Sequence, residues 1–178
     1  MKAVSRQFKV GALPVALRSS ASPQGHPLKA YLELTKPRVN LLVVLTSAAG
    51  FYLGSQGEID RPLLLSTLVG TGLLASGSAA INQYLERDLD ARMVRTATRP
   101  LPSGRLTPAA ALIFGTGLIT LGTIVLSLLV NPLACAIGLL TVLLYVAIYT
   151  PLKTRTALCT TVGAIPGALP PIIGWAGA

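Results

Sequence analysis

Four long uncharged stretches determine the expected architecture of this 178-residue chain. A membrane-spanning helix needs about 20 predominantly apolar residues. The uncharged stretches cover residues 39–57, 62–85, 106–152 and 156–178. The third is long enough for two such helices, and Asn131-Pro132 near its middle predicts a short turn between them. The pattern therefore predicts five membrane-spanning helices, at 39–56, 62–84, 106–130, 132–151 and 157–176.

Composition supports a membrane protein. Hydrophobic residues make up 52% of the chain and charged residues only 12%, whereas an average soluble domain has about 25% charged residues. A chain that crosses the membrane through long apolar segments is expected to be all-α. We predict a polytopic transmembrane helix bundle embedded in the lipid bilayer.

The basic residues predict the orientation of the helices. Of the 15 Lys and Arg residues, only Arg61 lies in the loop between the first and second predicted spans. The other 14 lie in residues 1–38, 86–105 and 151–156. Positively charged loops remain on the cytoplasmic side, so the N-terminus should be cytoplasmic. The net charge of +9 is then a topology signal that requires no nucleic acid. We expect the cell inner (plasma) membrane.

The first 30 residues leave an alternative open. They are polar and lack acidic residues, as expected of a disordered cytoplasmic tail. A mitochondrial transit peptide has the same composition, and it would place the chain in the mitochondrial inner membrane.

The most informative polar residues are Asn82, Glu86 and Asp90, which are spaced four apart and so share one helical face. Neither Glu86 nor Asp90 is followed by a basic residue three or four places later. Two stacked and unpaired carboxylates weaken a helix, so they require another explanation. Oxygen ligands of this kind suit a hard cation. The spacing predicts a site for Mg²⁺ that holds a diphosphate.

Asp88 lies on the opposite face of the same predicted helix. Arg92 follows it by four residues, a spacing at which opposite charges pair on a helix. We therefore expect Asp88 to form a structural ion pair with Arg92.

An arginine-rich loop follows the acidic face. Arg92, Arg95 and Arg99 recur at three- and four-residue intervals, before two prolines and Gly104 that favour turns. One guanidinium group can bind two phosphate oxygens at once, which suits a diphosphate beside the acidic face. The alternative is an ordinary cytoplasmic loop whose arginines contact lipid phosphates.

The second basic loop contains Lys153 and Arg155, which could close over the same diphosphate or simply anchor a helix end. The last predicted span carries Pro166, Pro170 and Pro171. A proline inside a helix leaves a backbone carbonyl without its hydrogen bond. In a bilayer such a carbonyl is tolerated only where it faces other helices or a cavity. This span should line an interior pocket. Its small residues would also allow close helix contact.

These motifs together resemble the UbiA superfamily of intramembrane prenyltransferases, and in particular its branch that farnesylates haem. The acidic motif N-x-x-x-E-x-D-x-D begins at Asn82, and R-P-L-P-S-G-R begins at Arg99. Supporting pieces are L-T-K-P-R-V from Leu34, Y-T-P-L-K from Tyr149 and G-A-L-P-P-I-I-G-W from Gly167. The Glu at the middle position of the acidic motif separates this branch from relatives that prenylate aromatic acids.

The resemblance implies about nine transmembrane helices around a lateral cavity, and transfer of a farnesyl group from farnesyl diphosphate to a vinyl group of haem B, giving haem O. It implies Mg²⁺ on this acidic motif and on a second one. The implied first-motif ligands, which would also be the catalytic residues, are Asn82, Glu86 and Asp90, with Asp88 as a weaker candidate. The implied diphosphate contacts are Arg95, Arg99, Arg105, Lys153 and Arg155.

This sequence departs from the family in one respect. No acidic residue follows Asp90, although the family carries its second acidic motif in later helices. We therefore expect residues 31–178 to be the N-terminal portion of an intramembrane prenyltransferase domain. Alternatives are prenyl transfer to a quinone-precursor ring or a chlorophyll-type alcohol, and an inactive membrane fragment that packs against partners in oxidase assembly. A transporter or channel fits poorly, because every charge lies in a loop or at a helix end.

Overall fold

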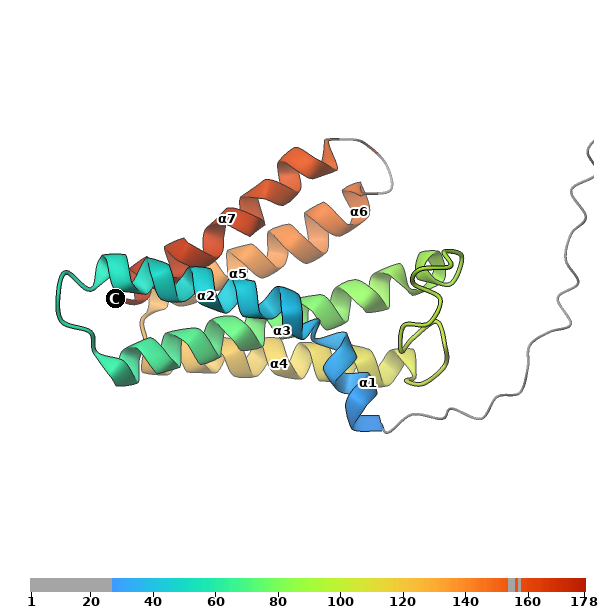
Figure 1. Cartoon of the computed structure of the whole chain (residues 1–178), viewed down its shortest axis with the longest axis horizontal. Coiled ribbons are helices and arrows are strands. Elements are labelled where there is room, and N and C mark those ends of the chain that lie inside the picture. The colour runs from blue at the N-terminus through green and yellow to red at the C-terminus, as the bar shows by residue number, and fades with distance from the viewer. Residues whose placement is uncertain (1–26, 154–155, 157) are drawn as a thin grey trace, which may run out of the picture.

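The computed structural model describes residues 27–153, 156 and 158–178, and every regular element in these residues is a helix. The all-α prediction is therefore confirmed. Figure 1 shows the helices α1 to α7 as elongated rods that lie roughly along one axis, apart from the short α1. In chain order the elements are α1 (Pro27–Leu34), α2 (Pro37–Gly54), α3 (Arg61–Asp90), α4 (Pro108–Leu129), α5 (Pro132–Leu143), a π-helix η1 (Leu144–Tyr149), α6 (Thr150–Leu152) and α7 (Cys159–Gly177).

Three of the long helices begin with the same local chemistry. The side chains of Asp60, Thr107 and Asn131 each accept a hydrogen bond from the backbone N–H three residues later. A proline follows in the first turn of each helix, where its missing N–H removes no hydrogen bond. The predicted turn at Asn131-Pro132 is thus confirmed as the start of α5.

In the residues that the structure describes, each of the five predicted segments forms a helix, and three helices are long and apolar enough to cross a membrane: α3, α4 and the continuous run Pro132–Leu152. The other two segments form α2, of 18 residues, and α7, of 19 residues. α2 begins with polar residues, and α7 contains three prolines. α3 continues beyond the predicted end at residue 84 as far as Asp90.

Glycines bring the helix backbones close together. A Cβ atom on Gly77 of α3 would lie 2.6 Å from the carbonyl oxygen of Gly115 on α4, and one on Gly122 would lie 2.9 Å from that of Gly70. On the other side of the bundle, a Cβ on Gly174 of α7 would clash with the backbone oxygen of Ser47 on α2. Small residues of this kind permit close packing where apolar surface alone gives no driving force.

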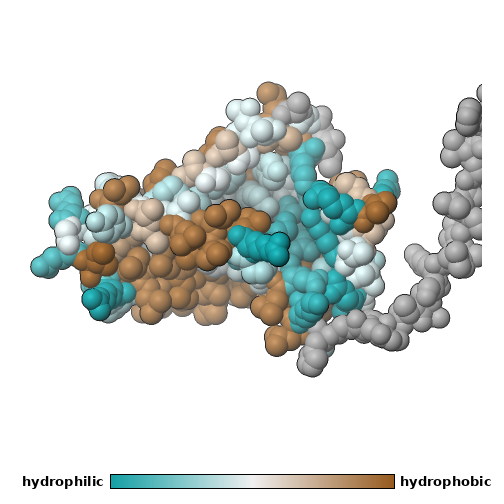
Figure 2. Space-filling view, in the orientation of Figure 1, coloured by the Kyte–Doolittle hydropathy of each residue, from teal (hydrophilic) through white to brown (hydrophobic). Residues whose placement is uncertain are grey.

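One end of the bundle is polar. The loop over residues 91–105 and α1 lie at the same end in Figure 1, and Figure 2 shows hydrophilic surface gathered there beside an apolar flank. α1 begins at Pro27, inside the predicted tail of residues 1–30, and residues 1–26 lie outside the described part of the chain. The predicted arginine loop therefore lies at the end where α3 terminates.

Candidate active site

The acidic face of α3 is turned into the bundle. Asn82, Glu86 and Asp90 are 2%, 6% and 2% exposed, respectively. Asp88, in contrast, has a side chain that is 78% exposed. The predicted separation of one inward-facing set from Asp88 on the outside is therefore present in the structure.

A hydrogen-bonded network joins this face to the segment that carries the second basic loop. The amide nitrogen Nδ2 of Asn82 donates to Oε2 of Glu86 at 3.0 Å, and Lys153 Nζ donates to Oε1 of the same carboxylate at 3.0 Å. The hydroxyl of Thr150 lies 2.8 Å from Oδ1 of Asn82. Residues about 70 positions apart in the sequence thus meet at one place.

Asp90 is held from the arginine loop. Arg99 Nη1 donates to Oδ2 of Asp90 at 2.6 Å, and the Thr96 hydroxyl donates to the Asp90 backbone oxygen at 2.9 Å. The prediction of two unpaired carboxylates is therefore wrong, because Glu86 and Asp90 each have a cationic partner. Spacing along one helix reveals only partners on that helix, whereas buried carboxylates take partners from any segment that packs on them.

The predicted pair between Asp88 and Arg92 is also wrong. The ion pair that Asp88 forms in the described structure is with Arg87, at 3.7 Å between Nη2 and Oδ2. α3 ends at Asp90, so Arg92 is not on the helical turn that the four-residue spacing assumed.

Lys36 is a further cation at this end of the bundle, and sequence reasoning gave it no role beyond its place in a motif. It caps α2 in a left-handed conformation, with φ of 49°, immediately before Pro37. Such a conformation costs about 1–3 kcal/mol for a residue other than glycine and is common at functional sites. The strained Lys-Pro step at the start of a predicted span was the signal available in the sequence.

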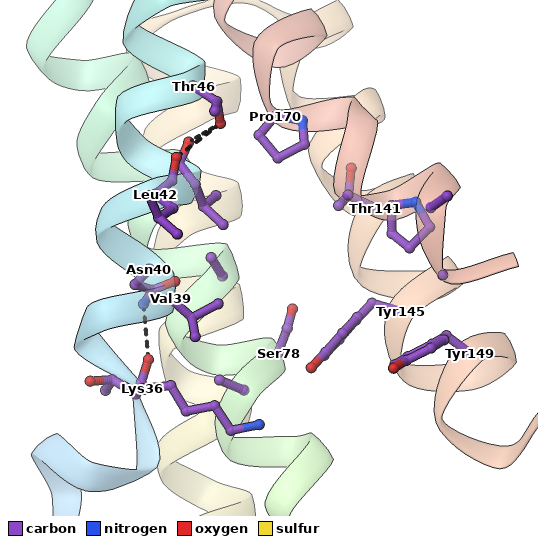
Figure 3. Close-up of a pocket in the computed structure, with 18 of the residues that line it drawn as sticks. Lys36, Val39, Asn40, Leu42, Thr46, Ser78, Thr141, Tyr145, Tyr149 and Pro170 are labelled. Atoms are coloured by element: carbon purple, nitrogen blue, oxygen red, sulfur yellow. Dashed lines mark hydrogen bonds between the residues drawn. The ribbon is translucent and has the colours of Figure 1, made fainter. Parts of the chain in front are cut away.

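The electrostatics of Lys36 place it among the other site charges. Burial lowers the pKa of its ammonium group, the positive charges of Arg99 and Lys153 lower it further, and the carboxylates of Glu86 and Asp90 oppose the shift. All four side chains therefore lie within electrostatic range of Lys36. In Figure 3 the Lys36 side chain extends from the start of α2 toward the space in front of Tyr145.

That space is a partly open cavity of about 590 Å³ lined by residues of α2, α3, the α5–η1 segment and α7. Its α7 wall includes Pro166 and Pro170, which confirms the prediction that the proline-rich segment lines an interior pocket. Gly163 on the same wall leaves room for a ring, since a Cβ there would lie 2.6 Å from Cε2 of Tyr149. The side chains of Tyr145 and Tyr149 are stacked with centroids 5.5 Å apart (Figure 3).

The predicted diphosphate contacts separate into different groups. Arg99 and Lys153 reach the acidic face, as described above, and Arg95 is exposed to solvent. Arg105 instead donates to the Glu33 carboxylate of α1 at 2.5 Å and to the backbone oxygen of Thr98 at 2.7 Å. The hydrogen bond from Arg105 to Glu33 lowers the pKa of the Glu33 carboxyl. Arg155 lies outside the described residues.

The side chains of the acidic face carry oxygen atoms of the kind that Mg²⁺ binds together with phosphate. Within the described residues, no group of three or more His, Cys, Asp or Glu side chains could enclose a metal. Mg²⁺, however, commonly uses one or two carboxylates and takes its other ligands from water and substrate phosphates. Two buried carboxylates and one carboxamide match that pattern.

The chain is 48% identical over 160 residues to a protein named protoheme IX farnesyltransferase from Solibacter usitatus, a match that covers 85% of this chain and 55% of the relative. Proteins of the same name from Synechococcus elongatus and Aquifex aeolicus are each 43% identical to this chain. The first match covers 90% of this chain and 51% of the relative, and the second covers 85% and 52%. The chain thus spans about half the length of these relatives.

Two solved structures share the fold. A structure of digeranylgeranylglyceryl phosphate synthase has a TM-score of 0.77 at 24% identity, covering 85% of this chain and 54% of that one. A UbiA homologue from Archaeoglobus fulgidus bound to DMAPP and Mg²⁺ has a TM-score of 0.67 at 18% identity, covering 83% and 52%. The sequence profile of the UbiA prenyltransferase family matches residues 43–178. This chain belongs to the UbiA prenyltransferase family.

Proposed function

We propose that this chain acts in the transfer of a farnesyl group from farnesyl diphosphate to a vinyl group of haem B, giving haem O. The observation that carries the proposal is the buried Asn82–Glu86–Asp90 face, which lies among three cations beside an apolar cavity. The acceptor is supported by the names of the relatives, which are called protoheme IX farnesyltransferase.

The acidic face would hold Mg²⁺ through oxygen atoms of Asn82, Glu86 and Asp90. When bound, the ion would supply Lewis acidity that neutralises charge on the departing diphosphate. Asp88 is a weaker candidate ligand because its side chain points to solvent.

Arg99, Lys153 and Lys36 would bind the diphosphate. Arg99 and Lys153 are hydrogen-bonded to the carboxylates, and a divalent cation on the same oxygens would compete with them. Their charges would then be available to phosphate oxygens, with which Arg and Lys form strong charge-assisted bonds. Fixed positive groups in a water-poor site stabilise a leaving anion without the cost of reorganisation.

The cavity would take the isoprenoid chain. Its volume lies within the range of about 300–1,000 Å³ that is common for small-molecule sites, and its walls are largely apolar. The C–O bond breaks and diphosphate leaves with the electron pair. The haem vinyl group then attacks the allylic cation, and water adds with loss of a proton. The rings of Tyr145 and Tyr149 line the cavity and would attract that cation, and an apolar cavity would slow its hydrolysis by water.

The test is a transfer assay with the purified protein in nanodiscs. Farnesyl diphosphate and haem B are supplied with Mg²⁺, and farnesylated haem is detected by mass spectrometry. A parallel reaction offers a quinone-precursor ring in place of haem. Farnesylated haem as the main product supports the proposal, whereas prenylation of only the ring would move the chain to another acceptor class.

The membrane and its orientation are part of the same proposal. The basic loops at 86–105 and 151–156 support a site on the cytoplasmic side, and the membrane that we propose is the cell inner membrane. A reporter fused after Gly57 should be external and one fused after Arg99 should be internal. The reverse pattern would contradict this orientation.

A further inference from the structure

Thr150 occupies a buried position between the acidic face and the cavity wall. It is 5% exposed and begins α6, directly after the π-helix η1. Its hydroxyl oxygen lies 2.8 Å from Oδ1 of Asn82 and 2.9 Å from the backbone oxygen of Tyr145. π-helical turns are rare and frequently occur at functional sites.

The orientation of the Asn82 carboxamide follows from its two neighbours. An ionised Glu86 side chain can only accept hydrogen bonds, so the amide NH₂ group of Asn82 must face it, as the 3.0 Å contact shows. The amide oxygen then faces Thr150, which has a hydroxyl proton to donate. The two contacts select one of the two ways in which the amide could be turned.

The hydroxyl of Thr150 has one proton and two acceptors within reach, Oδ1 of Asn82 and the backbone oxygen of Tyr145. The backbone N–H of Thr150 already donates to the Tyr145 carbonyl, so that oxygen has a partner without the hydroxyl. A carbonyl oxygen has two lone pairs. The amide oxygen of Asn82 can therefore accept from Thr150 and still bind a cation.

We propose that Thr150 is a positioning residue whose hydroxyl fixes the Asn82 carboxamide with its oxygen directed to a divalent cation. The inference rests on the proposed function, because it assigns Asn82 to that cation. Hydrogen bonds that orient metal ligands commonly affect metal affinity by about 10–100-fold. The same contact joins the segment that carries Lys153 to α3.

The test compares Thr150→Val, which keeps the shape and removes the hydroxyl, with Thr150→Ser, which keeps the hydroxyl and removes the methyl group. Binding of Mn²⁺ together with inorganic pyrophosphate is measured by calorimetry on the protein in nanodiscs, and thermal unfolding is recorded for each variant. We expect about 10–100-fold weaker binding for Thr150→Val and near-normal binding for Thr150→Ser. A packing role would make serine the more damaging change.

A double-mutant cycle separates this role from a general effect on the fold. In an Asn82→Ala background, Thr150→Val should weaken binding no further, since contacting residues that act together are not additive. Equal binding by the wild type and Thr150→Val, equal losses in both Thr150 variants, or full additivity with Asn82→Ala would each overturn the inference and leave the proposed function intact. If Mn²⁺ and pyrophosphate do not bind the wild type, the metal site and the role of Thr150 are both overturned.

Discussion

The two halves of α3 are stabilised in different ways, although they form one continuous helix. Its first half and its middle pack on α4 through close backbone contacts at Gly70 and Gly77, respectively. Its second half presents Asn82, Glu86 and Asp90 to cations and hydroxyls from other segments. The first half is sensitive to side-chain volume and the second to charge and hydrogen-bond direction. Substitutions should therefore affect stability at one end and chemistry at the other.

The largest effect is expected from removing charge at the acidic face. Glu86→Gln or Asp90→Asn should lower the rate of haem farnesylation by about 10²–10³-fold or more, comparable to losing one main stabiliser of a transition-state charge. The exposed Asp88→Asn should have a milder effect. Product formation by mass spectrometry is the measurement, and equal, small effects of all three substitutions would contradict the metal assignment.

Lys36 should show the next largest effect. Lys36→Met removes a charged partner for phosphate, and hydrogen bonds to charged groups contribute about 1.5–3 kcal/mol, so the KM for farnesyl diphosphate should rise by about 10–100-fold. Arg38→Met, two residues later and exposed, is the matched control. Similar KM values for both variants would remove Lys36 from the site.

Near the middle of α3, where the helix packs on α4, Gly77→Ala should destabilise the fold. The new methyl group would lie 2.6 Å from a backbone oxygen of α4, and such overpacking costs about 1–3 kcal/mol. The control is Gly117→Ala, where no atom lies within 4 Å of the new methyl group and alanine favours the helix. Thermal unfolding in detergent micelles should separate the two, and equal midpoints would show that the α3–α4 contact is less tight than described.

The smallest effect concerns the link between the arginine loop and α1. The pKa of Glu33 lies below its ordinary value of 4.5 because Arg105 donates a hydrogen bond to it. Its contribution to stability should be present above that ordinary value and lost as the pH falls through the lowered pKa. Because the pair is partly exposed, Glu33→Gln should cost less than about 1 kcal/mol at pH 7.

The measurement for this pair is the unfolding midpoint at two pH values. The difference between wild type and Glu33→Gln should vanish in acid. Glu58→Gln, in the exposed loop between α2 and α3, is the control. A difference that grows as the pH falls would contradict the sign of the pKa shift.

Sequence reasoning succeeded where the signal was local. The uncharged lengths and the Asn131-Pro132 turn predicted the helices, since apolar length and helix starts depend on neighbouring residues. The shared face of Asn82, Glu86 and Asp90 followed from the period of one helix. The prolines of α7 predicted a cavity wall because freed carbonyls need a site away from lipid.

The tertiary structure decided which groups meet that acidic face. Arg99 reaches Asp90 across nine residues, Lys153 reaches Glu86 across 67 and Thr150 reaches Asn82 across 68. The periodicity of a single helix cannot reveal partners at such sequence separations. Sequence reasoning therefore left both carboxylates unpaired and Lys36 without a role. The sequence by itself determined the helices and their polar face, because both depend on residues within a few turns. The ion pairs, the cavity and the orientation of the Asn82 amide arise only when separate helices pack together.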